Sequence, residues 1–239
     1  MEKLNNPPIV SAIYGIWWHL FKEKEQKQSE HLQGDFFNVV RNEYKDRKLG
    51  SYIYKPPFPT PQQLTEFKKS EKDDLSIILG RDELELKSTN KEEYKWGFFK
   101  KEIDYGLEKL FKVLASLEIE PDHYHLYLKY SNFISFGDDN SELFEFINKS
   151  FSINISQNFD DTVKNYNEFE FYCNYSFKED SSVSVNLKKK KKGILVNIEA
   201  ISGKENPYLE HISKWNNDAH EKCEDIFLKL FKPIFNTFK

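Results

Sequence analysis

The sequence predicts an α+β protein in which antiparallel meander sheets are covered by amphipathic helices. Two observations carry this prediction. Short runs of alternating apolar and polar residues are separated by turn sequences, a pattern typical of antiparallel strands with one solvated face. Two longer stretches, residues 103–117 and 219–235, repeat apolar residues at the spacing of a helix that buries one side. With 239 residues, the chain can form one large domain or two small ones.

The first half opens with an apolar stretch at residues 8–19. Apolar residues fall on both alternating faces there, so we expect a strand sandwiched between other layers. Ser29 is placed to cap a helix that ends near Asp46. Residues 50–74 contain a proline cluster and no regular pattern, which indicates an extended connection. We next expect a meander of three strands at residues 75–79, 83–87 and 94–99. The first long helix is expected to follow at residues 103–117.

The second half shows the same kinds of pattern. Its expected strands lie at residues 123–133, 151–156, 168–177, 183–187 and 194–198, with a short helix at residues 141–148. The last two strands are joined by a lysine run and Gly193, which predicts a hairpin with a charged tip. The sequence Asn216-Asn217-Asp218 is expected to cap the final helix, and Pro233 is expected to bend or break its last turn.

The element order suggests two similar α/β halves, residues 1–120 and 121–239, packed as one unit. Each half is expected to contain a strand, a helix, several meander strands and a long closing helix. No residue-level repeat is visible, so duplication is a hypothesis that rests on element order. The alternative is a ferredoxin-like first half over residues 8–133, with the order β-α-β-β-α-β.

Composition narrows the classes of protein. Thirty-five basic and thirty-nine acidic residues leave a net charge of −4, which gives no global attraction to nucleic acid or anionic lipid. The two cysteines, Cys173 and Cys223, are far apart and indicate a reducing compartment. The longest apolar stretch, residues 9–21, is shorter than the roughly 20 residues that cross a bilayer. We therefore expect a cytoplasmic protein with no membrane association.

No catalytic motif is visible, and an enzyme is the less expected interpretation. The glycines form neither nucleotide-binding fingerprint, no nucleophile elbow occurs, and no cofactor is expected. His123 and His125 are weak metal candidates, because alternation on a strand aims both imidazoles to one face, but spacing suggests no third ligand. His220 and Glu224 resemble part of a zinc-protease helix that lacks its second histidine, so we interpret them as a helix surface pair.

One local charge cluster stands out. Five consecutive lysines, which could contact a phosphate backbone from a hairpin tip, are Lys188, Lys189, Lys190, Lys191 and Lys192. The alternative, which we favour, is a solvated turn that discourages edge pairing, because no flanking aromatic and basic residues of the base-stacking kind accompany the run.

Four aromatic residues are candidates for contacts with a protein partner. Tyr52, Tyr54 and Phe58 lie in the proline-rich connection, and Trp215 lies just before the expected cap of the final helix. Rigid aromatic side chains in loops are common anchors at interfaces. They could equally clamp the loop onto its own domain. The prolines could also present a docking ligand, although a surface loop is the favoured interpretation.

Both ends of the chain carry a resemblance. The segments are Asn6-Pro7-Pro8-Ile9-Val10-Ser11-Ala12-Ile13 at the start, and Trp215-Asn216-Asn217-Asp218-Ala219-His220 followed by residues 226–231 at the end. They resemble a sporadically distributed, uncharacterised family of bacterial and archaeal proteins, in which a Pro-hydrophobic-Val strand opens the chain and an Asp-Ala-His helix closes it. Ser11 departs from the family pattern, which often has an acidic residue there.

The resemblance implies no catalytic or binding activity, because its motifs look like structural elements and not like active sites. The patchy spread of the family is typical of mobile or defence-linked genes. Our leading expectation is a non-enzymatic sensor, adaptor or neutralising subunit that binds a protein partner in a bacterial hetero-complex, in a setting such as defence against phage. The alternative is an RNA-binding or DNA-binding protein that uses the lysine tip and an open sheet.

Overall fold

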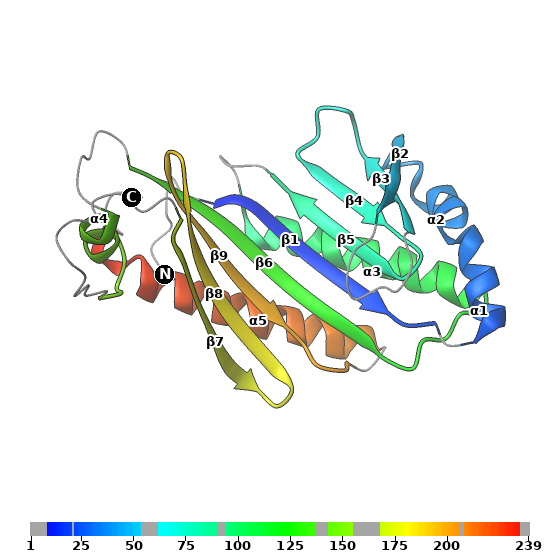
Figure 1. Cartoon of the computed structure of the whole chain (residues 1–239). Coiled ribbons are helices and arrows are strands. Elements are labelled where there is room, and N and C mark those ends of the chain that lie inside the picture. Colours follow the sequence, from blue (N-terminus) through cyan, green and yellow to red (C-terminus); the bar gives the residue numbers. More distant parts are fainter. Residues whose placement is uncertain are drawn as a thin grey trace.

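The computed structural model describes residues 9–20, 22–53, 62–89, 94–136, 143–154, 168–205 and 208–234, and only the backbone of residues 51–53. These residues form one antiparallel sheet of nine strands in the order β2-β3-β4-β5-β1-β6-β9-β8-β7 (Figure 1). The strands are β1 (Ile9–Trp18), β2 (Asp46–Ile53), β3 (Gln62–Lys68), β4 (Leu75–Leu79), β5 (Glu83–Ser88), β6 (Tyr124–Ser135), β7 (Glu170–Lys178), β8 (Ser181–Lys190) and β9 (Gly193–Ile201). The predicted α+β class with an antiparallel sheet is confirmed.

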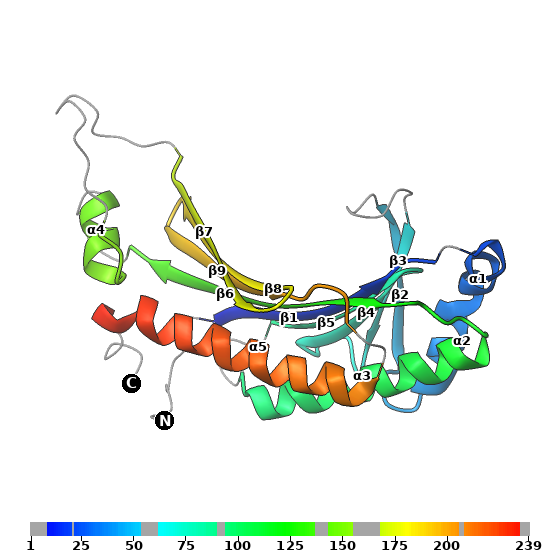
Figure 2. The same cartoon turned by 90° about the horizontal axis from the view of Figure 1, so that it is seen from below.

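The helices of the described residues gather mainly on one face of the sheet. They are α1 (Glu23–Gln28), the 3-10 turn η1 (Ser29–His31), α2 (Leu32–Val40), α3 (Trp96–Ser116), α4 (Leu143–Ser150) and α5 (Leu209–Leu230). Figure 2 shows α3 and α5 running along one side of the sheet, while the strands at both ends of the sheet rise on the other side. None of the described helices combines the length and apolarity that crossing a bilayer requires.

The core lies between the sheet and α3 and α5. On the central strands β1 and β6, alternate side chains such as Tyr14, Ile16, Leu126 and Leu128 are fully buried beneath the helices. The apolar stripes of α3 and α5 cover them, which is how a one-sided sheet hides its apolar face.

The two halves of the chain have a similar element order, although the first half has five described strands and the second has four. In the first half β5 lies beside β1, and β4, β3 and β2 follow outwards; in the second half β9 lies beside β6, and β8 and β7 follow. The two halves meet along the antiparallel pair β1–β6. The strands β4, β5, β1 and β6 are also adjacent in the arrangement expected of a β-α-β-β-α-β unit, with β2 and β3 as an addition.

Several local predictions are confirmed. The meander strands β4 and β5, the hairpin of β8 and β9 and the alternating strand β7 lie where their patterns place them, and the two long helices cover most of their predicted ranges. Lys191 and Lys192 form the two-residue turn of the hairpin, flanked by the paired residues Lys190 and Gly193. Each of these features is specified within a short window of sequence.

Other predictions are wrong. β1 is central but not sandwiched, because only its even-numbered residues face the helices. The expected connection at residues 50–74 contains parts of β2 and all of β3, and residues 96–99 begin α3 instead of forming a strand. Ser29 donates its hydroxyl to the Gln26 carbonyl at 2.6 Å and does not cap α2. Residues 151–154 form no strand, and α5 begins seven residues before the expected cap, at Leu209 in place of Asn216.

Candidate functional site: the uncovered face of the sheet

The face of the sheet opposite α3 and α5 is the principal candidate site. We call it the uncovered face, because no described helix lies along it in Figure 2. Strand alternation and the pairing registers place odd-numbered residues of β1, β5, β6 and β9 on it. Cross-strand rows therefore bring together residues far apart in sequence, including Lys87, Ile13, Lys129 and Glu199 in one row.

Gly15 creates a close contact at the centre of this face. Tyr127 lies directly opposite Gly15 on β6, and a Cβ atom at Gly15 would lie 2.1 Å from Cε1 of Tyr127. The tyrosine ring thus crosses β1, and its hydroxyl donates a hydrogen bond to the Glu85 carboxylate on β5. Burial raises the pKa of Tyr127 well above its usual value, and the Glu85 charge adds to this effect. A glycine within an apolar strand was the sequence signal for this close approach.

Next to this contact lies a cluster of aromatic and histidine rings. Trp17 stacks on His125 with ring centroids 3.9 Å apart and contacts His19 edge-on at 5.3 Å. His123 meets His125 edge-on at 5.2 Å. Burial is the main cause that lowers the pKa of both His123 and His125, and neighbouring positive charges lower it further. The lowered pKa values favour the neutral form of both imidazoles, and the rings form a cluster of one stacked and two edge-on contacts.

The histidine cluster is not a metal centre in the described part of the chain. The structure does bring His19, a third imidazole, close enough to His123 and His125 to affect their pKa values, which spacing did not suggest. However, no group of three or more His, Cys, Asp or Glu side chains among the described residues is arranged to hold a metal ion. Stacking against Trp17 explains the position of His125 without a ligand role.

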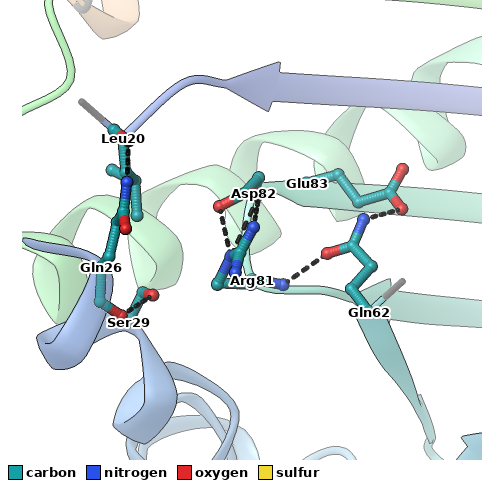
Figure 3. A network of polar contacts seen from close by, with 7 residues as sticks. All are labelled: Leu20, Gln26, Ser29, Gln62, Arg81, Asp82 and Glu83. Carbon is teal, nitrogen blue, oxygen red and sulfur yellow. Dashed lines mark hydrogen bonds and ion pairs between the residues drawn. The ribbon is translucent and has the colours of Figure 1, made fainter. Parts of the chain in front are cut away.

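A polar network holds the β4–β5 turn at the margin of the uncovered face (Figure 3). Gln62 donates from Nε2 to Glu83 Oε1 at 2.8 Å and accepts the Arg81 backbone N–H at 2.8 Å. Arg81 pairs with Asp82 at 2.8 Å. A Cβ at Gly80 would lie 2.5 Å from the Gln62 side-chain oxygen, so glycine is needed for this approach. Glu83 is thereby fixed as a hydrogen-bond acceptor inside a structural network.

The lysine run lies at one end of the uncovered face. Register with β9 and β7 places Lys188 and Lys190 on the same side as Lys129 and Tyr172. Lys188 is exposed and lies 3.4 Å from Glu170 on β7. Tyr172 is 61% exposed. Only Lys191 and Lys192 form the hairpin tip, because Lys188, Lys189 and Lys190 belong to β8 and not to the predicted turn. Lys188 and Lys190 therefore share a surface with an aromatic and a basic group, a combination not visible in the linear sequence.

The aromatic partner candidates have different outcomes. The prediction of Trp215 as an exposed aromatic in a loop is wrong. Trp215 lies inside α5, is 2% exposed, and donates from Nε1 to the Ser181 hydroxyl at 3.2 Å. Its residue type fits this place, because an indole buries a large apolar area while its N–H finds an acceptor. Tyr52 lies in the edge strand β2, where only the backbone is described. Tyr54 and Phe58 lie outside the described residues.

His220 is not the simple surface residue that its sequence context suggested. Its ring stacks on Trp96 at 4.2 Å, and its Nδ1 lies 2.9 Å from the Tyr130 hydroxyl, which also accepts from Tyr94 at 3.0 Å. Burial lowers the pKa of His220 to about 4. A cavity of about 480 Å³ adjoins it, lined by Trp96, Asn217, His220, Glu221, Glu224, Asp225 and Leu228. His220 thus joins α5 to α3 and the sheet.

Comparisons with known proteins assign no family. No protein-family model matches the chain, and no curated protein matches it. One solved structure in the comparison is that of the Pct1 RNA triphosphatase of S. pombe in complex with the Spt5 CTD. It is 7% identical, with 95% of this chain and 82% of that chain covered, and its TM-score of 0.13 carries no argument about fold or function. The family resemblance at the chain ends stays a prediction.

Proposed function

We propose that this chain is a non-enzymatic interaction subunit that binds a protein partner in a hetero-complex through the uncovered face of its sheet. The observation that carries the proposal is the asymmetry of the sheet, with helices along one face and none of the described helices along the other. A broad sheet face of this kind offers an extended docking surface. Sensor, adaptor and neutralising roles all fit such a surface.

The side chains on this face suit a protein partner. Half-buried apolar and aromatic groups, among them Ile13, Trp17 and Phe133, lie on it. Ile201, on the same face, is 40% exposed. Protein interfaces combine aromatic and apolar groups at the core with polar groups at the rim. Rings held by stacking, as Trp17 is on His125, lose little side-chain entropy when a partner binds.

The charge pattern favours a protein over a polyanion. Lys129 lies directly opposite Glu199 on β9, and Lys87 follows Glu85 on the same face of β5. Interleaved charges of both signs give a weak net field, whereas a phosphate backbone calls for a concentrated positive surface. Charges of alternating sign instead provide specificity for a complementary protein surface.

The test is amine labelling of the chain, alone and in the complex isolated from its native host, with mass spectrometry as the readout. We expect modification of Lys87 and Lys129 to fall several-fold in the complex, while Lys101, exposed on α3, is labelled equally in both states. Ile13→Arg is expected to abolish the complex, and Glu108→Arg on exposed α3 to leave it intact. Equal labelling of Lys87 and Lys129 with and without the partner contradicts the proposal.

A second candidate function, binding of single-stranded nucleic acid, is supported by the position of the lysine hairpin. Lys188 and Lys190 share a face with Tyr172 and Lys129, so basic groups and an exposed ring are adjacent. The test replaces five lysines by Ser: Lys188, Lys189, Lys190, Lys191 and Lys192. Retention on RNA should weaken, and the slope of log affinity against log salt concentration should become less negative by about 0.7 for each lost phosphate contact. Unchanged, salt-insensitive retention removes this candidate.

The biological setting rests on the family resemblance. A role in defence against phage is proposed from the patchy spread of that family, which is an associational argument. Infection of host cells that carry or lack the chain, with Ile13→Arg as the matched variant, tests the setting separately from the binding surface.

A further inference from the structure

β7 forms an outer edge of the sheet with several unusual properties. Among the described strands it pairs only with β8. It is nine residues long, contains no proline and carries two exposed aromatic residues, Tyr172 at 61% and Tyr175 at 52% exposure, on opposite faces. Its charged residues, Glu170 and Lys178, stand at its two ends, and a long edge whose interior lacks charges and prolines is a template for pairing with another strand.

The direction of the free backbone groups follows from the ladder with β8. The Lys189 N–H donates to the Phe169 carbonyl at 2.9 Å, so this pair is hydrogen-bonded. Bonded residues alternate in an antiparallel ladder, so Phe171, Cys173 and Tyr175 also bond to β8. The residues between them therefore direct N–H and C=O away from the sheet, and these are Glu170, Tyr172, Asn174 and Ser176.

We propose that a second copy of this chain binds here, with the two β7 strands antiparallel and the two nine-stranded sheets continuous. The bulge in β7 selects the register. It falls between Ser176 and Lys178, which leaves Glu170–Ser176 as the regular stretch of the strand. An antiparallel pair with two-fold symmetry aligns all of this stretch with itself only when Cys173 lies on the two-fold axis.

This register is favourable on both faces of the sheet. Phe171 lies opposite Tyr175 of the second copy, which makes two aromatic pairs related by symmetry, and such cross-strand pairs stabilise antiparallel sheets. Tyr172 lies opposite Asn174 of the second copy. Glu170, the only charged residue of the stretch, lies opposite Ser176, so no like charges meet.

The other edge of the sheet is less suited to self-pairing. β2 has a register shift in its middle, between Leu49 and Tyr52, and begins with three consecutive charged residues, Asp46, Arg47 and Lys48. Bulges and charges of this kind discourage edge-to-edge pairing. The dimer proposed at β7 leaves the uncovered face free, so it stands or falls separately from the proposed function.

The register predicts a specific cross-link. Cys173 of each copy occupies a non-hydrogen-bonded pair, in which Cα atoms lie about 4.5 Å apart. This separation is within the range of about 4.4–6.8 Å that a disulfide spans. The second cysteine, Cys223, is 1% exposed in α5 and provides the matched control.

The experiment measures mass by light scattering under reducing conditions and cross-linking after treatment with diamide. We expect a dimer that oxidation cross-links in the wild type and in Cys223→Ser, and a dimer without a cross-link in Cys173→Ser. A monomer at all concentrations, or a dimer that oxidation does not join through Cys173, overturns the proposal.

A proline substitution separates dimerisation from folding. The N–H of Asn174 points away from β8, so Asn174→Pro should yield a folded monomer with unchanged circular dichroism. Asn186 lies within β8, between two strands, and Asn186→Pro should destabilise the fold itself. A dimer that persists in folded Asn174→Pro contradicts pairing along this edge.

Discussion

Gly15 and Tyr127 face each other across the central strand pair, and the tyrosine ring occupies the space that a side chain at position 15 would need. Gly15→Ala should therefore displace the ring and destabilise the protein by about 1–3 kcal/mol, the usual range for overpacking. Urea unfolding measures the change.

Two controls accompany the Gly15 variant. Gly34, in α2, has open space around it, because a Cβ atom added there would meet nothing within 4 Å. Gly34→Ala should therefore be neutral or stabilise by up to about 1 kcal/mol. In the Tyr127→Ala background, Gly15→Ala should cost less stability than in the wild type, because the ring with which the new methyl group clashes is gone. If Gly15→Ala is as harmless as Gly34→Ala, the contact with Tyr127 is not present in solution.

Glu102 is a buried carboxylate on α3 that binds residues from the segments after α2 and β3. It accepts hydrogen bonds from the Tyr44 hydroxyl at 2.7 Å and from Lys69 at 2.6 Å. Glu102→Ala should cost about 1–3 kcal/mol of unfolding free energy, because the buried Tyr44 hydroxyl loses its acceptor. Glu102→Gln keeps an acceptor oxygen and should cost less. Equal losses in the two variants, measured by chemical denaturation, would argue against the hydrogen-bond explanation.

His220 should make the protein less stable in acid. Its pKa in the folded state is lowered to about 4 by burial, below the ordinary value of 6.5, so the unfolded chain binds the proton more tightly. The contribution of His220 to the unfolding free energy should be constant above about pH 7 and fall as the pH drops from 6.5 towards 4, by up to about 1.4 kcal/mol per unit.

The contribution of His220 is isolated by comparison with a variant. His123 and His125 have lowered pKa values too and act in the same direction, so the measurement is the difference between wild type and His220→Gln. We expect the difference in unfolding free energy between wild type and His220→Gln to shrink as the pH falls from 7.5 to 4.5. A constant difference across this range contradicts a neutral, buried His220.

Trp215 should behave as a core residue and not as an interface anchor. Trp215→Ala should destabilise the protein by about 3–5 kcal/mol, as large aromatic truncations in cores do. Tyr208, just before α5 and 66% exposed, is the matched control, and Tyr208→Ala should change stability by less than about 0.5 kcal/mol. Thermal unfolding measures the stability of both variants. A small effect of Trp215→Ala, similar to that of Tyr208→Ala, would contradict the burial of Trp215.

Local sequence patterns are enough to specify the α+β class, the long helices and the β8–β9 hairpin. These features depend on residues close together in the chain: the alternation of Val183, Val185 and Leu187, the two-residue turn at Lys191, and the stripe of α5. Local periodicity and turn chemistry carry this information. Local patterns did not predict β2 and β3, because the prolines between these strands interrupt the alternation and the pairing of the strands depends on residues distant in the sequence.

The side of the sheet that stays uncovered, and therefore the place of the candidate site, emerges only from the three-dimensional packing. Gly15, Glu85 and Tyr127 are separated by dozens of residues, and the strand order brings them into one row. The same holds for the burial of Trp215 and for the shared face of Lys188 and Tyr172. Strand order and helix placement arise from the packing of the whole core, which no short window of residues contains.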